Sequence, residues 1–213
     1  MEKLKLNNGL EIPVIGLGTW DLREIKPILD AIKLGYRLID TAQMYQNEAI
    51  VGEAVRLSNI DRKEFFITTK LNSSCNDYGS AKKGIDESLK RLQMDYVDCF
   101  LIHEPYSHYS KMYQALIEAY HAGKVKSIGI SNFNYAKVLD LIKGFDVIPM
   151  INQVESHVYF PQLELKENLD KQHIQMQSWG PFTEGVKDIF HEPILVEIAN
   201  NHHKTSAQIA LKY

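Results

Sequence analysis

Short apolar runs alternate with longer amphipathic stretches along almost the whole chain. Seven runs have the composition of β-strands, and they cover residues 14–18, 36–40, 65–70, 96–102, 125–130, 149–155 and 174–178. Helical periodicity predicts helices at 24–34, 47–57, 80–93, 110–122, 135–143, 161–171, 193–203 and 205–213. Strands that are apolar along most of their length are buried on both faces, as in a parallel sheet covered by helices. The pattern therefore predicts an α/β fold.

Two architectures fit this alternation, an open doubly wound sheet and a closed (β/α)8 barrel. Gly16 and Gly18 form a GLG turn, but the third glycine of a dinucleotide-binding fingerprint is absent. Polar residues stand at the carboxyl end of nearly every predicted strand: Asp40, Lys70, His103, Ser131, Asn132, Gln153, Glu155 and Ser178. Barrel active sites are built on that face from several strands. We therefore predict a TIM barrel.

The N-terminal segment LKLNNGLEIPVI lies outside the strand-helix repeat. It consists of two short alternating runs around Asn8-Gly9, and Asn-Gly favours a β-hairpin because both turn positions require a positive φ. A hairpin is therefore expected before the barrel. At 213 residues the chain has the length of one domain, so residues 1–213 are predicted to form a single domain.

Charge and composition narrow the class of partner. The small negative net charge of -3 gives no positive electrostatic potential that would attract nucleic acid or a membrane surface, so a small molecule is the expected partner. Cys75 and Cys99 have the pattern of reduced thiols, and the eight histidines form no recognised metal motif. The start MEKLKLNNG carries charges where a signal peptide would be apolar, and no run approaches 18 apolar residues. A cytoplasmic protein without a metal is predicted.

Four side chains near the strand ends form a set that can protonate a carbonyl oxygen. Tyr45 is a weak acid with an ordinary pKa of about 10, and a nearby cation such as Lys70 favours its phenolate. Asp40 would keep Lys70 charged, and His103 could hold the substrate oxygen. Two other roles stay open: Asp40 and Lys70 can form a structural ion pair, or Lys70 can act as a Schiff-base nucleophile.

Five segments of the chain resemble motifs of the aldo-keto reductase family. They are GYRLIDTAQMYQNEAIVGEAV, LIHEP, AGKVKSIGISNF, INQVESH and QSWGPF, in this order along the sequence. The resemblance covers essentially the whole chain and is strongest to the bacterial 2,5-diketogluconate reductase-like branch. It implies reduction of an aldehyde or ketone by an NADP-dependent oxidoreductase, with a small carbonyl compound as substrate and NADP(H) as cofactor. It also implies a monomer for an intact relative.

The resemblance implies a role for individual residues. Tyr45 would donate the proton, Lys70 would lower its pKa, and Asp40 would anchor Lys70, while His103 would orient the carbonyl. Cofactor binding would fall to Asp40, Ser131, Asn132, Gln153, Ser178 and Trp179, with the Trp179 ring stacking on nicotinamide. Substrate binding would fall to Trp20, Tyr45 and His103.

The chain departs from the family pattern in three ways, one of which is Val158 after His157, where a proline is common. Glu104 follows His103, where tryptophan or another residue stands in many relatives. The last predicted helix, 205–213, is not followed by the eighth strand-helix unit or by the basic residues that hold the 2'-phosphate of NADP in the family. The resemblance therefore implies a chain truncated at its C-terminus, able to associate through an open barrel edge. The alternative function is that of an inactive relative that binds nicotinamide or a partner protein.

Overall fold

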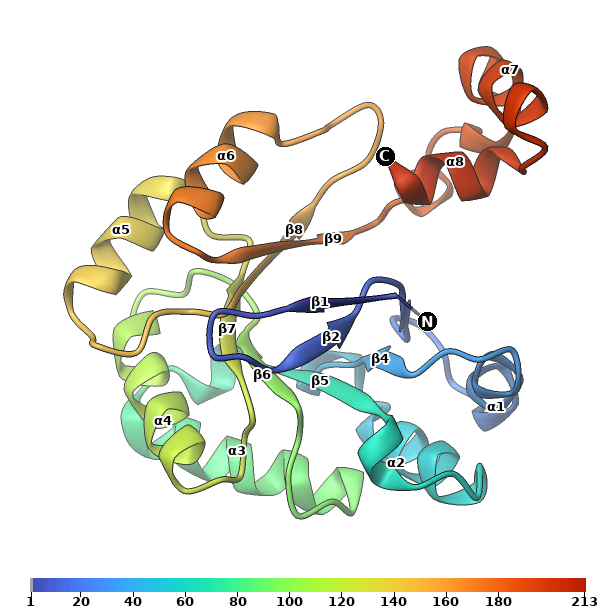
Figure 1. Ribbon diagram of the computed structural model, residues 1–213. Coiled ribbons are helices and arrows are strands. Elements are labelled where there is room, and N and C mark those ends of the chain that lie inside the picture. Colours follow the sequence, from blue (N-terminus) through green and yellow to red (C-terminus); the bar gives the residue numbers. More distant parts are fainter. Residues whose placement is uncertain (1) are drawn as a thin grey trace.

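The computed structural model describes residues 2–213 and contains a strongly curved sheet of seven parallel strands with helices around it (Figure 1). The strands are β3 (Gly16–Gly18), β4 (Leu38–Asp40), β5 (Phe66–Leu71), β6 (Cys99–Ile102), β7 (Ile128–Ser131), β8 (Ile151–Glu155) and β9 (Gln175–Trp179). Their order in the sheet is their order in the chain. A nearly closed, TIM-like barrel is therefore confirmed.

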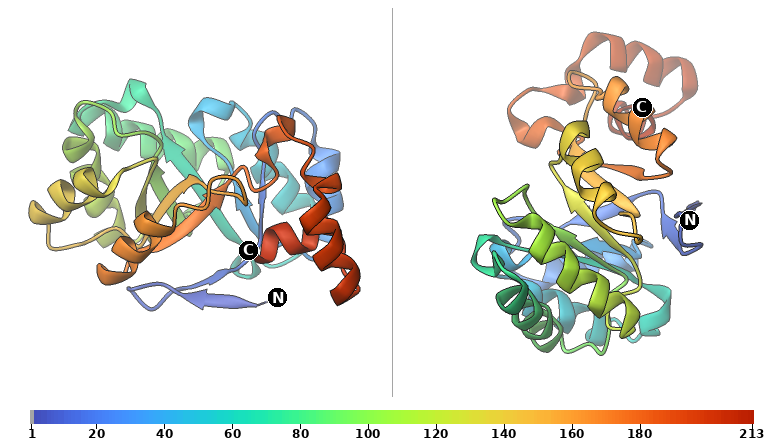
Figure 2. Two further views of the ribbon diagram at one scale, coloured as in Figure 1. Left: turned by 90° about the horizontal axis from the view of Figure 1, so that it is seen from above. Right: turned by 90° about the vertical axis from the view of Figure 1, so that its left-hand side faces the viewer.

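Helices follow the strands of the sheet, and the first six of them cover its outer surface (Figure 2). They are α1 (Ile25–Lys33), α2 (Glu48–Leu57), α3 (Tyr78–Leu92), α4 (Tyr109–His121), α5 (Tyr135–Lys143), α6 (Leu163–Lys171), α7 (Pro193–His202) and α8 (Ser206–Lys212). Their ends differ from the predicted ones by no more than two residues. In α3, the apolar face of Ile85, Leu89 and Leu92 is buried as its spacing predicts.

Strands β6 and β7 each begin three residues later than predicted. Before these strands, Val97 and Val125 form an isolated parallel bridge. Each apolar sequence run is therefore longer than the stretch of continuous hydrogen bonding between the two strands. Apolar residues continue beyond the strand because these positions are buried in the core as well.

The predicted N-terminal hairpin is present as β1 (Lys3–Lys5) paired with β2 (Glu11–Pro13). Its turn differs from the prediction, because Gly9 has a positive φ of 87° whereas Asn8 does not. The backbone N–H of Leu6 bonds to the carbonyl of Leu10, which makes a longer loop with one left-handed residue. One residue with positive φ is enough for this loop.

The hairpin loop lies at the amino ends of the barrel strands. Asn7 donates to the carbonyl oxygens of Pro149 and His173, and Asn8 donates to that of Lys126. These carbonyls precede β8, β9 and β7 respectively. The hairpin is therefore bound to the opposite end of the barrel from the polar strand ends, which it leaves accessible.

Beyond β9 the chain forms a small helical unit beside the barrel (Figure 1). Here α7 and α8 pack around a separate apolar cluster of Ile189, Leu195 and Ala210. Within residues 2–213, β3 and β9 do not pair with each other and are the two edge strands. Cys75 and Cys99 are both buried and free, as predicted for thiols of this kind.

Candidate active site

The carboxyl ends of the parallel strands bring the predicted site residues to one end of the barrel. Asp40 ends β4, Lys70 lies near the end of β5, His103 follows β6, Ser131 ends β7, Gln153 lies on β8 and Trp179 ends β9. Tyr45 lies on a short 3-10 helix, Gln43–Tyr45, that follows β4. Strands about 4.8 Å apart bring these side chains within reach of one another.

A buried ammonium group links three of these elements. Lys70 is fully buried, and its Nζ pairs with the carboxylate of Asp40. The same Nζ lies 3.2 Å from the hydroxyl oxygen of Tyr45 and 3.3 Å from the carbonyl oxygen of Thr41. These three acceptors match the three N–H donors of an ammonium group. Lys70 is thus held in one position, with a donor directed at the Tyr45 hydroxyl.

Burial and charge act in opposite directions on Lys70 and Tyr45. Burial lowers the pKa of Lys70, but the combined effect of Asp40 and Tyr45 outweighs it and leaves the pKa above its ordinary value. Lys70 therefore stays charged, and an ammonium group cannot attack a carbonyl. This geometry does not favour the Schiff-base role that the sequence left open.

The net pKa of Tyr45 reflects its burial as well as the charge of Lys70. Burial raises it above the ordinary value, and the opposing charge of Lys70 does not fully compensate. Lys70 does act in the predicted direction. The net rise was not predicted, because the sequence does not show how deeply the Tyr45 phenol is buried.

His103 lies beside Tyr45, with ring centroids 5.6 Å apart and ring planes at 81°. Burial and then the charge of Lys70 lower the pKa of His103 to about 4. The imidazole is therefore neutral near pH 7 and has one N–H donor. Its Nδ1 is buried and has no hydrogen-bond partner in the described part of the chain.

The turn that carries Tyr45 is held by residues to which the sequence reasoning gave no role. Asn47 is buried; it accepts from the hydroxyl of Thr41 at 2.6 Å and donates to the carbonyl oxygen of Thr19 at 2.7 Å. The guanidinium of Arg23 also donates to the carbonyl oxygen of Tyr45. Asn47 thus ties the segment after β3 to the segment after β4. The polar Gln-Asn-Glu sequence at 46–48 was the available signal.

Gln153 extends the polar cluster across the barrel. Its Nε2 donates to the second carboxylate oxygen of Asp40 at 2.8 Å and to Oε1 of Gln177 at 3.0 Å. A carboxylate only accepts, so the amide must present its nitrogen to Asp40. Both N–H groups of Gln153 are then used, and its carbonyl oxygen remains as an acceptor. Gln177, on β9, was not predicted.

Asn132 connects the strand ends on the other side of the site. It follows β7 with a left-handed φ of 63°, and its backbone N–H donates to the carbonyl oxygen of Gln153 at 2.8 Å. Its side-chain Nδ2 donates to Glu104 at 2.6 Å, and its Oδ1 accepts from the indole N–H of Trp179 at 2.8 Å. Glu104 is a further site residue without a role in the prediction.

The remaining predicted residues differ in accessibility. Ser131 is buried at the end of β7, Ser178 is exposed on β9, and Trp20 is 60% exposed after β3. All three lie at the carboxyl side of the sheet. The structure therefore brings Asp40, Lys70 and Tyr45 into direct contact, places the His103 ring beside Tyr45, and leaves Trp20 at the rim.

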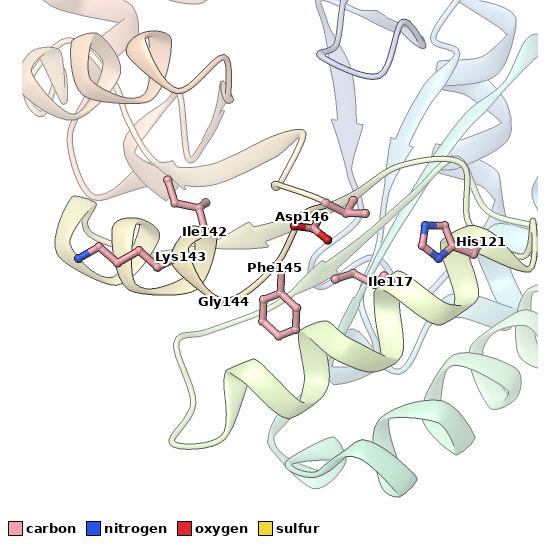
Figure 3. Close-up of a pocket in the computed structure, with 8 residues that line it drawn as sticks. Ile117, His121, Ile142, Lys143, Gly144, Phe145 and Asp146 are labelled. Carbon is pink, nitrogen blue, oxygen red and sulfur yellow. The ribbon is translucent and has the colours of Figure 1, made fainter.

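A surface recess of about 400 Å³ lies elsewhere, between α4 and the segment after α5 (Figure 3). Ile117, His121, Lys143 and Phe145 are among its lining residues, and it contains none of the predicted site residues. In residues 2–213 no group of three or more His, Cys, Asp or Glu could hold a metal ion. No helix in the same range is long and apolar enough to cross a membrane.

Comparisons with known proteins agree with this geometry. The model of the aldo/keto reductase family matches residues 14–213. Glyoxal reductase of Bacillus subtilis is 37% identical over 217 residues, which covers 100% of this chain and 78% of that protein. Methylglyoxal reductase DkgA of Escherichia coli is 37% identical, covering 99% and 78%. A crystal structure of an aldo/keto reductase from Brucella melitensis superposes with a TM-score of 0.94 at 41% identity, covering 99% and 82%.

Proposed function

Because the chain belongs to the aldo/keto reductase family, we propose that it reduces the carbonyl group of an aldehyde or ketone to an alcohol with NADPH. The observation that carries the proposal is the buried Lys70, whose ammonium pairs with Asp40 and lies 3.2 Å from the Tyr45 hydroxyl. The names of the glyoxal and methylglyoxal reductases support small, reactive dicarbonyl compounds as the substrate class.

The residues around Gln153 fit a nicotinamide carboxamide. Such a group needs an acceptor for its N–H and a donor for its oxygen. The carbonyl oxygen of Gln153 remains as an acceptor because both of its N–H groups are already used. The Ser131 hydroxyl supplies a donor, Asn132 and Ser178 lie at or near the ends of β7 and β9, and the Trp179 ring offers an apolar face. When bound, the reduced nicotinamide supplies a hydride to the carbonyl carbon.

Tyr45 would donate its proton to the carbonyl oxygen as that oxygen becomes an alkoxide. Its raised pKa keeps it protonated at neutral pH, and the Lys70 ammonium stabilises the phenolate that remains. Asp40 keeps the ammonium in place through their ion pair. The proton would thus pass from the hydroxyl oxygen of Tyr45 to the oxygen of the substrate carbonyl.

His103 would hold the substrate oxygen beside Tyr45. Its lowered pKa keeps the ring neutral, so it donates a hydrogen bond without competing with Tyr45 as an acid. Trp20, exposed after β3, would form one wall of the substrate-binding region. These two residues define where the carbonyl lies and where the rest of the substrate extends.

The proposal is tested by the oxidation of NADPH in the presence of methylglyoxal. Tyr45→Phe is expected to lower turnover by about 10²- to 10⁴-fold and to leave NADPH affinity nearly unchanged. Tyr36→Phe is the matched control, because Tyr36 precedes β4 at the opposite end of the strand. Unchanged turnover in Tyr45→Phe would contradict the assignment. Binding of NADPH without turnover by the unmodified chain would instead favour a non-catalytic relative.

A further inference from the structure

Glu104, Asn132 and Trp179 form a hydrogen-bonded chain across three strand ends. The amide nitrogen of Asn132 donates to a carboxylate oxygen of Glu104 at 2.6 Å, and the indole nitrogen of Trp179 donates to the amide oxygen of Asn132 at 2.8 Å. From this chain we infer that Glu104 is a positioning residue that orients the Asn132 amide and, through it, the Trp179 ring. Its consequence for nicotinamide binding rests on the proposed function.

The chemistry of the two ends determines which way the Asn132 amide points. The carboxylate of Glu104 only accepts hydrogen bonds, and the indole N–H of Trp179 only donates. A flipped amide would set its oxygen against the carboxylate and its NH2 group against the indole N–H, so both bonds would be lost. The negative charge of Glu104 therefore selects a single orientation of the amide.

The rest of Asn132 is also held. Its backbone N–H donates to the carbonyl oxygen of Gln153 at 2.8 Å, and its φ is fixed at 63°. Its Nδ2 lies 3.4 Å from the carbonyl oxygen of His103, a longer contact than the 2.6 Å contact with Glu104. Short hydrogen bonds to ionised groups are about twice as strong as neutral ones. Glu104 is thus the dominant partner of the Asn132 side chain.

Glu104 acts on the site through Asn132 and not on the reacting groups. The hydrogen bond of its side chain goes to Asn132, whereas the hydroxyl of Tyr45 bonds to Lys70. Removal of the Glu104 carboxylate should therefore release the amide and loosen the indole. The proton-donating group would remain intact, so the effect should appear in nicotinamide affinity before it appears in the chemical step.

The first test observes the side chains directly in the free protein by two-dimensional ¹H-¹⁵N NMR. Two tryptophans are present, so a Trp20→Phe variant assigns the indole N–H resonance of Trp179. Glu104→Ala should shift that resonance and the side-chain amide resonances of Asn132. Glu104→Gln, which keeps an acceptor oxygen, should restore part of the native shifts. Unmoved resonances in Glu104→Ala would overturn the inference.

The second test measures the affinity for NADPH and the turnover of methylglyoxal. Glu104→Ala should weaken NADPH binding by about fivefold to tenfold and change kcat much less, and Glu104→Gln should stay closer to the unmodified protein. Glu53→Ala, on the exposed face of α2, is the matched loss of a carboxylate. Shifted resonances with unchanged NADPH affinity would contradict the effect on the cofactor site. If the unmodified protein bound no NADPH, the proposed function would fail, and the resonances would still decide whether Glu104 orients Asn132 and Trp179.

Discussion

The ammonium nitrogen of Lys70 lies 3.2 Å from the hydroxyl oxygen of Tyr45, in a part of the barrel where Lys70 has no exposed surface. A buried charge needs a partner, and Asp40 supplies it. The same three-residue contact therefore contributes both to the stability of the barrel mouth and to the proposed chemistry. Mutations can separate the two contributions.

Replacement of Lys70 by methionine should reduce both stability and turnover. The free energy of unfolding should fall by about 3–5 kcal/mol because the Asp40 carboxylate loses its cation, and turnover should fall by about 10²- to 10⁴-fold. Denaturant unfolding and NADPH-dependent reduction of methylglyoxal measure the two effects. The double variant Asp40→Leu with Lys70→Met should regain much of the stability and none of the turnover. A double variant as unstable as the single one would contradict the pairing.

The raised pKa of Tyr45 predicts the pH dependence of reduction. A proton donor must be protonated, and burial extends the protonated range above the ordinary tyrosine pKa of about 10. The kcat for reduction should therefore show no loss from Tyr45 between neutral pH and about pH 10. The reverse oxidation of an alcohol needs the phenolate and should become faster as the pH rises. A loss of kcat for reduction centred well below pH 9 that the titration of no other group explains would exclude Tyr45 as the donor.

His103 should make the protein less stable as the pH falls. Its folded pKa is about 4 and its unfolded pKa is about 6.5, so the unfolded state binds the extra proton between these values. The contribution of the neutral His103 ring to the free energy of unfolding is fully present above about pH 6.5. It should decline by roughly 2–4 kcal/mol as the pH approaches 4.

The control for this prediction is His103→Gln, which lacks the titrating ring. The difference in free energy of unfolding between the two proteins should change with pH only between about 4 and 6.5, because the other titrating groups cancel. Urea unfolding at several pH values measures it. A constant difference across this range would show that His103 is not held neutral by the fold.

The two tryptophans should separate cofactor from substrate binding. Trp179→Leu removes the stacking ring and should raise the KM for NADPH by about tenfold, whereas Trp20→Leu should act mainly on the KM for the carbonyl compound. Each variant serves as the control for the other, because both lose an indole at the same end of the barrel. Equal effects of both variants on NADPH would contradict the division.

Gly52 tests the packing of the helical layer. A Cβ at this position of α2 would lie 2.1 Å from the carbonyl oxygen of Leu92, at the end of α3. Gly52→Ala should therefore lower the free energy of unfolding by about 1–3 kcal/mol despite its better helix propensity. Gly79→Ala, in the first turn of α3, meets only a side-chain oxygen at 3.4 Å and should be neutral or stabilising. Thermal unfolding of the two variants distinguishes close packing from general helix effects.

The helices and the parallel strands could be predicted because their signals are local. The buried face of Ile85, Leu89 and Leu92 follows directly from helical spacing. The convergence of Asp40, Lys70 and His103 follows from the parallel direction of the strands, since each residue stands near the carboxyl end of its own strand. The resemblance to a known family then suggested a role for each residue.

The hydrogen-bond partners within the site could not be predicted in the same way. Gln153 binds Asp40, which is 113 residues away in sequence, and no local pattern marks such a pair. Glu104 was noticed as a departure from the family, but its bond to Asn132 depends on how two neighbouring strand ends face each other. Asn47 likewise holds a turn together through contacts with two separate loops.

Local spacing, strand direction and motif order were thus enough to predict the barrel, the residues proposed to react and the family, because each depends on short-range pattern or on residue type. The state of the reacting groups depends on the packed barrel. Burial sets the net pKa of Tyr45 above its ordinary value, and the surrounding charges keep Lys70 protonated despite its burial. Desolvation and hydrogen bonding act through distances in space, and these exist only after the chain has folded.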